Sequence, residues 1–452
     1  MDFGGNVLKI LFVSLGCDKN LCDSEAMLGL LKENGFEITN DEKDADVIVI
    51  NTCSFIHDAK EESITTILEM ANLKEDGKLK ALIVSGCLAQ RYKDDIMKEI
   101  PEVDAVVGTT AYDEIVNAVN CALEGKNEIF IKDNNYLPDM NEQRVITTGG
   151  ITSYIKIAEG CDKRCTYCII PKLRGSYRSV PMEKIIAQAD YLAGQGVKEL
   201  VLVAQETTVY GKDIYGEKML PQLLRKLCKV NGIEWIRILY CYPEEITDEL
   251  IKVMKEEDKI CNYLDMPIQH SSDNILKRMG RRTTRDELTT LISKLRKEIP
   301  DIILRTTLIT GFPGETSEDF EDLLDFVYDT SFNRLGVFTY SPEEDTPAYS
   351  MENQIDEEIK EERKNQVMQM QQDIAFDFTA SLVGKVFNVL IEGYIPEDDV
   401  YVGRTYMDAP GVDGYVFVKA PMELLSGQFV DVEITEASGY DLVGKLAYVV
   451  DK

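Results

Sequence analysis

The sequence predicts an α/β protein in three parts: an N-terminal doubly wound parallel sheet domain, a central partial (β/α)6 barrel and a C-terminal small antiparallel β-barrel. The first two parts follow from two stretches in which short apolar strands alternate with helix-like segments. The third follows from short strands separated by glycine turns after Ala380. The chain has 452 residues, of which 44% are hydrophobic and 29% are charged. This length exceeds one ordinary core, and the composition is typical of soluble globular proteins.

The first alternation runs from Val7 to about Gly125 and predicts a domain over residues 7–125. Short apolar runs bounded by Gly or Asn are typical of strands that are buried on both faces of a parallel sheet. We expect strands at Leu8–Ser14, Val47–Ile50, Leu82–Ser85 and Ala105–Val107, with helices such as Ser24–Asn34 and Asp58–Asn72 between them. The polar stretch over residues 126–146, around "KDNNYLPDMNEQRVITTGG", is predicted to be a linker.

The second alternation starts from Thr152 and predicts a domain over residues 147–378. Its expected strands are "SYIKIAEG", "ELVLVAQ", "WIRILYC", "NYLDMPIQ", "ILRTTLITG" and "NRLGVFTYS". Repeated strand–helix units of this kind predict a partial α/β barrel, whose active site lies at the C-terminal mouth. A charged helix, Asp356–Phe378, leads out of it, and residues 379–452 are predicted to form the small β-barrel.

The charge and the cysteine content limit the possible partners and compartments. A net charge of −31 argues against nonspecific binding to nucleic acid, because phosphate binding depends on Lys and Arg. An acidic surface would instead attract a basic partner, although it can also serve solubility alone. No apolar run is long enough to span a bilayer, and the N-terminus lacks the features of a secretory signal. Eleven Cys without the spacing of a disulfide framework fit the reducing cytoplasm.

Three expected strands of the first domain each end at a cysteine. "ILFVSLGC" ends at Cys17, "DVIVINTC" at Cys53 and "ALIVSGC" at Cys87. Residues just beyond the carboxyl ends of parallel strands line the ligand crevice of an open sheet, so these three thiolates could meet at one site. The alternative is that each Cys packs as a small hydrophobic side chain.

The second domain carries a CxxxCxxC array directly after its first strand, in "AEGCDKRCTYCIIP". Cys161, Cys165 and Cys168 could bind zinc, but a structural zinc site needs four ligands, and neither His57 nor His270 lies nearby in sequence. Three Cys on one loop instead suit a four-iron–four-sulfur cluster whose fourth iron stays open to a ligand. We assign no catalytic role to either His.

These features resemble a known family. The CxxxCxxC loop after the first strand of a partial barrel is similar to that of the radical S-adenosylmethionine (SAM) enzymes. In those enzymes the open iron chelates SAM, and reduction cleaves it to a 5′-deoxyadenosyl radical. The N-terminal Cys and a C-terminal barrel like a TRAM domain resemble the methylthiotransferases over essentially the whole chain. The resemblance implies SAM as a cofactor and a second four-iron–four-sulfur cluster on Cys17, Cys53 and Cys87.

Two branches of this family differ in substrate. One modifies adenosine in transfer RNA, and the RimO branch modifies an aspartate of the small-subunit ribosomal protein S-twelve. The stretches that resemble the RimO branch are "SLGCDKNLCDSE", "AEGCDKRCTYCIIPKLRGSYRS", "LVAQETTVYG", "RILYCYPEEI" and "TLITGFPGET". Asp18 and Lys19 stand where the transfer-RNA enzymes usually have Gln and Met. Cys22 and Ser54 depart from the pattern without replacing an implied ligand, and we interpret Cys22 as a packing residue.

The resemblance implies that one SAM methylates a sulfur on the second cluster, while the radical from another SAM removes hydrogen from the aspartate β-carbon that receives the methylthio group. An electron donor and a sulfur donor would be needed, and the substrate would be a basic ribosomal protein rather than transfer RNA. The segment Thr379–Lys452 agrees with a basic partner, since it has 12 Asp and Glu against 5 Lys and Arg. Methylthiolation of transfer RNA, an iron–sulfur electron-transfer protein and a zinc-stabilised binding module are the alternatives.

The resemblance also implies contacts with SAM. The implied residues are Tyr167 beside the adenine, Gln205 and Glu206 at the amino group or ribose, and Arg305, Gly311, Gly314 and Glu315 at the mouth of the barrel. Barrel packing or turn chemistry is the alternative for each of them. The basic run Lys277–Arg282 could bind a substrate carboxylate, or it could be the basic end of a helix that stops at Gly280.

Overall fold

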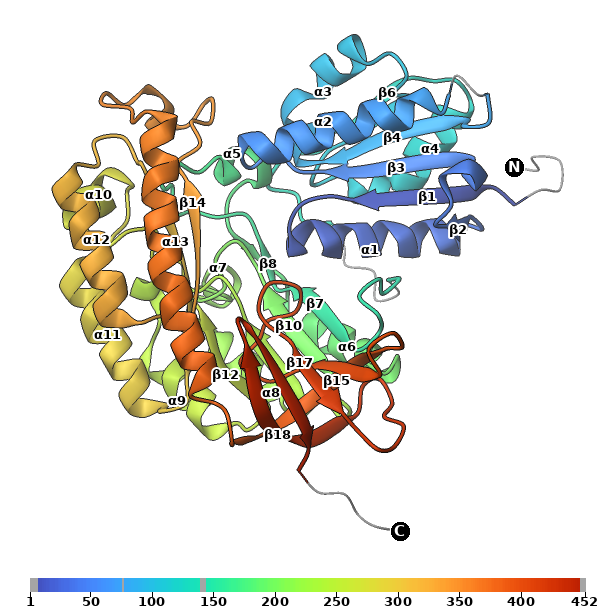
Figure 1. Cartoon of the computed structure of the whole chain (residues 1–452). Coiled ribbons are helices and arrows are strands. Elements are labelled where there is room, and N and C mark those ends of the chain that lie inside the picture. Colours follow the sequence, from blue (N-terminus) through green and yellow to red (C-terminus); the bar gives the residue numbers. More distant parts are fainter. Residues whose placement is uncertain (1–6, 75–76, 139–143, 448–452) are drawn as a thin grey trace.

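The computed structural model describes residues 7–74, 77–138 and 144–447. Figure 1 shows an N-terminal sheet domain in blue, a central sheet with helices in green to orange, and a C-terminal barrel in red. The expected α/β fold class with these three parts is confirmed. Among the described residues, no helix is both long enough and apolar enough to cross a bilayer.

The N-terminal sheet is entirely parallel and has the strand order β2-β1-β3-β4-β5-β6. The bounds are Lys9–Ser14 (β1), Glu37–Thr39 (β2), Val47–Thr52 (β3), Ala81–Gly86 (β4), Ala105–Val107 (β5) and Glu128–Phe130 (β6). The sequence missed β2 and β6, because both are short edge strands without buried side chains. Strand β6 lies inside residues 126–146, the stretch that was expected to be a linker. This part of the stretch instead pairs with β5 and extends the sheet.

Helices cover both faces of this sheet, as a doubly wound domain requires. The bounds are Asp18–Glu33 (α1), His57–Asn72 (α2), Cys87–Glu99 (α3) and Ile115–Leu123 (α4), with 3-10 helices at Glu42–Asp44 (η1) and Tyr112–Glu114 (η2). In β3, Val47 and Val49 pack with α1 and α4, whereas Ile48 and Ile50 pack with α2 and α3. The chain runs outward from β1 to β2 and then returns to β3 on the other side of β1. The ligand crevice of such a sheet lies at the carboxyl ends of β1 and β3.

Helix α1 begins directly after Cys17, well before the expected start at Ser24. Its first turns carry Lys19, Asn20 and Asp23, and these polar side chains hide the apolar periodicity of a helix. All three are nevertheless buried. They are buried because α1 packs against the central domain, where strand β7 is its neighbour.

The central sheet is parallel and has the order β14-β13-β12-β11-β10-β7, which confirms the six expected strands. The strands are Thr152–Lys156 (β7), Glu199–Val203 (β10), Trp235–Ile238 (β11), Ile260–Asp265 (β12), Ile303–Thr310 (β13) and Arg334–Thr339 (β14). The helices between and after them are Ile170–Arg174 (α5), Met182–Gly194 (α6), Lys212–Tyr215 (α7), Leu220–Leu227 (α8), Asp248–Glu256 (α9), Asp273–Arg278 (α10), Arg285–Glu298 (α11), Ser317–Thr330 (α12) and Glu357–Ala380 (α13), with 3-10 helices at Pro243–Glu245 (η3) and Pro347–Ser350 (η4). The larger helices form the main core with one face of the sheet, and the other face packs on the C-terminal barrel.

The C-terminal part is a closed barrel with the strand order β15-β16-β17-β19-β18, so the expected small barrel is confirmed. The bounds are Val386–Ile395 (β15), Val400–Arg404 (β16), Val416–Lys419 (β17), Phe429–Ser438 (β18) and Asp441–Leu446 (β19). One pairing differs from an antiparallel barrel, because β17 and β19 are parallel. The chain forms β18 first and then turns back along it, so β19 closes the barrel in the same direction as β17.

A buried group of charges fixes this barrel to the central sheet. Glu199 in β10 accepts hydrogen bonds from Arg237 Nε at 2.7 Å and from Arg404 Nη2 at 2.6 Å. All three side chains are fully buried. Burial alone would raise the pKa of Glu199, but Arg404 and Arg237 lower it to about 2. The carboxylate therefore stays charged between its two arginines and links β10, β11 and β16.

We expect Glu199→Gln to reduce the free energy of unfolding by roughly 3–5 kcal/mol, because the buried guanidinium of Arg237 loses its counter-charge and that of Arg404 keeps only Glu392. Acid should act in the same direction on the unaltered protein. The stabilisation is complete above the ordinary carboxyl pKa of 4.5 and is lost as the pH falls toward about 2. Denaturant titration measures the free energy, with Arg225→Gln, which breaks only partly exposed ion pairs, as the control. Equal losses in the two variants would contradict the role of Glu199.

Candidate metal centre and active site

The first three candidate ligands lie at the carboxyl ends of neighbouring strands. Cys17 follows β1, Cys53 follows β3, and Cys87 is the first residue of α3 after β4. Gly16 has a φ of +96°, and a Cβ atom at this residue would lie 2.9 Å from the Cβ atom of Cys53. Glycine therefore lets the turn after β1 approach the turn after β3. The structure places all three cysteines at one edge of the sheet.

These three thiols lie within electrostatic range of one another. Burial is the main cause that raises the pKa of Cys53 to about 12. The nearby Cys87 and Cys17 contribute in the same direction. Burial also raises the pKa of Cys87, while the guanidinium of Arg174 opposes this effect. Thiolates so close together repel each other, and metal ligation requires the deprotonated form. A positively charged group such as an iron–sulfur cluster core is therefore needed to hold all three as thiolates.

The second trio lies on the loop between β8 (Ala158–Glu159) and α5. Cys161 and Cys165 are buried, and Cys168 is half-buried. Burial raises the pKa of Cys161 to about 12, and the nearby Cys165 adds to the shift. Burial also raises the pKa of Cys168, and the nearby Cys165 and Cys161 raise it further. Two thiols of this trio are thus buried, as are Cys53 and Cys87 of the first trio, whereas Cys17 is exposed.

The basic segment Lys277–Arg282 packs against this loop. The backbone N–H of Thr166 donates to the Met279 carbonyl at 2.9 Å. The guanidinium carbon of Arg281 lies 4.2 Å from the ring centroid of Tyr242, whose hydroxyl lies 3.7 Å from the sulfur of the middle cysteine of the loop. The segment thus supports the cysteine loop, which agrees with the helix-end interpretation. Its use as a site for a substrate carboxylate stays a prediction.

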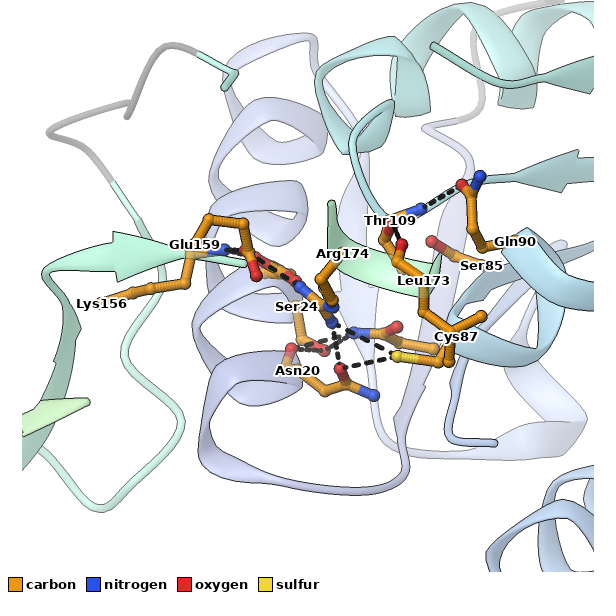
Figure 2. A network of polar contacts seen from close by, with 12 residues as sticks. Asn20, Ser24, Ser85, Cys87, Gln90, Thr109, Lys156, Glu159, Leu173 and Arg174 are labelled. Atoms are coloured by element: carbon orange, nitrogen blue, oxygen red, sulfur yellow. Dashed lines mark hydrogen bonds and ion pairs between the residues drawn. The ribbon is translucent and has the colours of Figure 1, made fainter. Parts of the chain in front are cut away.

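A buried polar network joins the two cysteine trios, and Figure 2 shows its centre. Arg174, the last residue of α5, places Nη2 3.6 Å from the sulfur of Cys87. Its Nη1 donates to Asp23 in α1 at 2.8 Å and to Glu159 at 3.1 Å. Lys156 donates to the same two carboxylates, at 2.6 Å to Glu159. A continuous set of charged contacts therefore connects the first trio to the strand that precedes the second.

This network was not among the candidate sites predicted from the sequence. A signal was present, because Lys156 and Glu159 interrupt the apolar strand "SYIKIAEG". A charged side chain in a strand that is buried on both faces must find a partner. The identity of the partners could not be predicted, since Asp23 lies in a different domain.

Four buried polar atoms near the second trio have no hydrogen-bond partner within the described part of the chain. They are Oε2 of Glu206, Oε2 of Glu244, and Nε and Nη1 of Arg281. Lys163, inside the cysteine loop, lies 3.6 Å from Glu206. Burial raises the pKa of Glu206 to about 7, against the opposing effects of Thr208 and Lys163. Unpaired buried polar atoms are rare and indicate a missing partner, and the amino and hydroxyl groups of SAM would provide one.

Two of the expected SAM contacts border the cysteine loop. Gln205, which follows β10, accepts from the Gly160 N–H at 2.9 Å and donates to Glu159 at 2.8 Å. Tyr167 packs edge-on against Phe312, with ring centroids 6.4 Å apart. Glu206, described above, is the third expected residue at this place. Contact of these side chains with SAM stays a prediction.

The other expected SAM contacts have partners elsewhere in the protein. Arg305 forms an ion pair with Asp265 at 2.8 Å and lies 3.9 Å from Asp413 of the C-terminal barrel. Glu315 is fully buried and pairs with Arg363 of α13 at 2.8 Å. The two glycines lie against side chains, Gly311 against Lys360 and Gly314 against Arg278. These contacts support packing for the four residues, and a role in binding SAM stays a prediction for them too.

Within residues 7–74, 77–138 and 144–447, no group of three His, Cys, Asp or Glu side chains converges as the ligands of one metal ion do. A four-iron–four-sulfur cluster has a different requirement, since each of its thiolates binds a different iron. The assignment of the two trios to clusters rather than to zinc rests on the cysteine pattern in the sequence and stays a prediction.

Comparison with known proteins first defines the class. Residues 155–327 match the radical SAM superfamily, residues 9–108 match "Uncharacterized protein family UPF0004", and residues 383–447 match the TRAM domain. A similar fold occurs in the radical S-adenosylmethionine methyltransferase TsrM from Kitasatospora setae, with a TM-score of 0.53 and 14% identity over 85% of this chain and 78% of that chain. The chain has the fold of a radical SAM enzyme and matches that superfamily, a class that uses SAM and a four-iron–four-sulfur cluster.

The relatives then define the family. A protein of Lachnoclostridium phytofermentans named "Ribosomal protein uS12 methylthiotransferase RimO" is 64% identical over 437 residues, which cover 97% of this chain and 99% of the relative. A protein of the same name from Acetivibrio thermocellus is 53% identical over 445 residues, covering 97% and 98%. The chain belongs to the RimO family of radical SAM methylthiotransferases. The family resemblance seen in the sequence is thus confirmed.

Proposed function

We propose that this enzyme adds a methylthio group to the β-carbon of an aspartate in ribosomal protein uS12. The observation that carries the proposal is the presence of two separate cysteine trios that lie close to each other. Cys87 of the first trio packs against Ile169 and Leu173, and Ile169 directly follows Cys168 of the second trio. A chain that must both generate a radical and supply sulfur needs two such sites at short range.

Each trio is assigned one four-iron–four-sulfur cluster. Cys161, Cys165 and Cys168 would hold the cluster that leaves one iron open for SAM, because a loop with three Cys provides one ligand too few for full ligation. The first trio would hold the second cluster at the edge of the N-terminal sheet. The mutual influence of the thiols on their pKa and the burial of four of them, Cys53, Cys87, Cys161 and Cys165, support both assignments.

When bound, the open cluster with SAM supplies the radical that removes hydrogen from an unactivated carbon, and the second cluster supplies the sulfur. The chain contributes position and charge. The Oε2 atom of Glu206, which accepts no hydrogen bond within the described part of the chain, would bind the amino group of SAM, and the ammonium group of Lys163, 3.6 Å from the same oxygen, orients the carboxylate. Tyr167 lies in an apolar cluster with Phe312 and Tyr340, which would exclude water beside the adenine.

The charge of the C-terminal barrel favours a basic protein over transfer RNA as the substrate. Within the described barrel, Arg404 is buried against Glu199, and Lys445 pairs with Glu433 at 3.4 Å. The exposed basic side chains there are Lys385, Lys419 and Lys445. Binding to RNA depends on several phosphate contacts from Lys and Arg. An acidic barrel instead complements a basic ribosomal protein and speeds the encounter with it.

The reaction requires an electron donor for the open cluster and a sulfur donor that restores the second cluster. We assign the enzyme to the cytoplasm. All eleven cysteines are free thiols, which fits a reducing compartment, and a ribosomal protein is met there.

Deleting the gene for this chain is expected to remove the methylthio group from the uS12 aspartate and to leave transfer RNA unchanged, because the acidic barrel selects the protein substrate. Mass spectrometry of ribosomal proteins and digested transfer RNA from the deletion strain measures both. Complementation with the unaltered gene is the control and should restore the modified aspartate. Loss of a methylthio group from transfer RNA, with the uS12 aspartate unaffected, would replace this proposal by the transfer-RNA function.

A further inference from the structure

Arg174 lies beside Cys87 of the first trio (Figure 2), and the roles assigned above do not include it. Its side chain is fully buried. The Nη2 atom donates to Asn20 Oδ1 at 2.5 Å and lies 3.6 Å from the sulfur of Cys87. The end of α5 is held in place, because Thr109 donates to the Leu173 carbonyl at 2.9 Å. The guanidinium is thus fixed with one edge toward a cluster ligand.

The charges around Arg174 balance in pairs. Asp23 and Glu159 are the two carboxylates, and Lys156 and Arg174 are the two cations. Lys156 directs its ammonium group to the carboxylates, whereas Arg174 divides its two ends between the carboxylates and the sulfur of Cys87. Arginine remains protonated in proteins, so this positive charge beside the sulfur is permanent.

We infer that Arg174 is a positioning residue of the second cluster: it donates an N–H bond to the Cys87 thiolate and thereby raises the reduction potential of the cluster. This inference rests on the proposed assignment of that cluster to the first trio. A reduced cluster carries one more negative charge than an oxidised one, and a nearby cation stabilises the reduced state in a desolvated site. Hydrogen bonds to the ligand sulfurs act in the same direction.

The same contacts fix the geometry between the two sites. Glu159, which accepts from Arg174, also accepts from Gln205, and Gln205 in turn accepts from the Gly160 N–H directly before Cys161. Arg174 therefore contacts a ligand of the first trio directly and reaches the loop of the second through a chain of three hydrogen bonds. This arrangement sets the potential and the position of the second cluster together.

The experiment uses the full chain with Cys161→Ala, Cys165→Ala and Cys168→Ala as its parent, so that only the second cluster is loaded. In a titration with dithionite the cluster takes up one electron, and no bond forms or breaks. Adding Arg174→Gln should lower the equilibrium constant for one-electron reduction of the cluster at least tenfold. This change corresponds to a reduction potential that is about 59 mV more negative. Electron paramagnetic resonance measures the reduced fraction at each potential.

Arg144→Gln in the same parent is the matched control. Arg144 is also a buried arginine at the contact with α1, where it lies 3.6 Å from Glu25, but its hydrogen bonds go to Ser153 and Tyr154. We expect no change in potential for this variant. A potential that stays unchanged in Arg174→Gln, or that moves equally in both variants, would show that Arg174 serves the fold alone.

A second variant decides the matter if Arg174→Gln does not retain iron. Arg174→Gln combined with Asp23→Asn removes an ion pair as a whole and leaves Lys156 paired with Glu159. Its potential should also lie below that of the parent, because the cation that is removed is the group in contact with the sulfur. A potential equal to that of the parent would overturn the inference. A parent without iron would instead overturn the second cluster itself, and this inference with it.

Discussion

Replacing Cys161, Cys165 and Cys168 together by Ala is expected to abolish the reductive cleavage of SAM. These residues are the proposed ligands of the cluster with the open iron, and without them no iron remains to bind SAM. The assay is the formation of 5′-deoxyadenosine in the presence of SAM and dithionite under anaerobic conditions, followed by chromatography. The product should fall to the background of the reaction without enzyme.

The control for this variant uses cysteines that lie outside both trios. Replacing Cys121, Cys228, Cys241 or Cys261 by Ala or Ser should leave the iron content and the cleavage of SAM intact. Cys241 and Cys261 are as buried as the proposed ligands, so they match the packing change. Continued cleavage in the triple variant, or loss of cleavage in these controls, would contradict the assignment of the open cluster.

Replacing Cys17, Cys53 and Cys87 by Ala is expected to stop methylthio transfer while SAM cleavage stays detectable. The first trio would supply the sulfur, whereas the open cluster in the central domain would be unaffected. The iron content of the reconstituted protein should fall from about eight to about four per chain by the ligand count. Iron analysis, 5′-deoxyadenosine formation and mass spectrometry of the uS12 peptide are measured on the same preparation.

Two outcomes would refute this second assignment. One is methylthio transfer at the normal rate by the variant without the first trio, because another sulfur source would then be at work. The other is an unaltered protein that saturates near four irons while these three thiols still react as free cysteines. Cys22→Ala is the matched control, since Cys22 is a nearby buried cysteine whose side chain contacts the Tyr154 carbonyl rather than the trio. It should retain both iron and transfer.

The inner strands of both parallel sheets could be predicted because a strand that is buried on both faces has apolar side chains at consecutive positions. The edge strands β2 and β6 could not, since they are short and without buried side chains. The start of α1 was missed for a related reason. Lys19, Asn20 and Asp23 look solvent-exposed in the sequence, yet they are buried against the central domain. Interfaces between domains carry polar residues that local patterns assign to the surface.

The candidate ligands could be predicted because three strand ends and one short loop carry their cysteines in a recognisable order. The residues around them could not. Arg174 and Asn20 are 154 positions apart and meet only through the packing of two domains. Arg305 in β13 and Glu315, which follows this strand, illustrate the reverse case, because the resemblance assigned both to the SAM-facing mouth. Arg305 pairs with Asp413 of the C-terminal barrel, and Glu315 pairs with Arg363 of α13.

The most direct test offers both possible substrates to the purified, anaerobically reconstituted enzyme with SAM and a reductant. If the proposed function is right, uS12 gains one methylthio group at the β-carbon of its aspartate, and 5′-deoxyadenosine forms in the same reaction. Transfer RNA stays unmodified. Peptide and nucleoside mass spectrometry of the same reaction measure the two products. Methylthio-adenosine in the RNA with an unmodified uS12 aspartate would contradict the account.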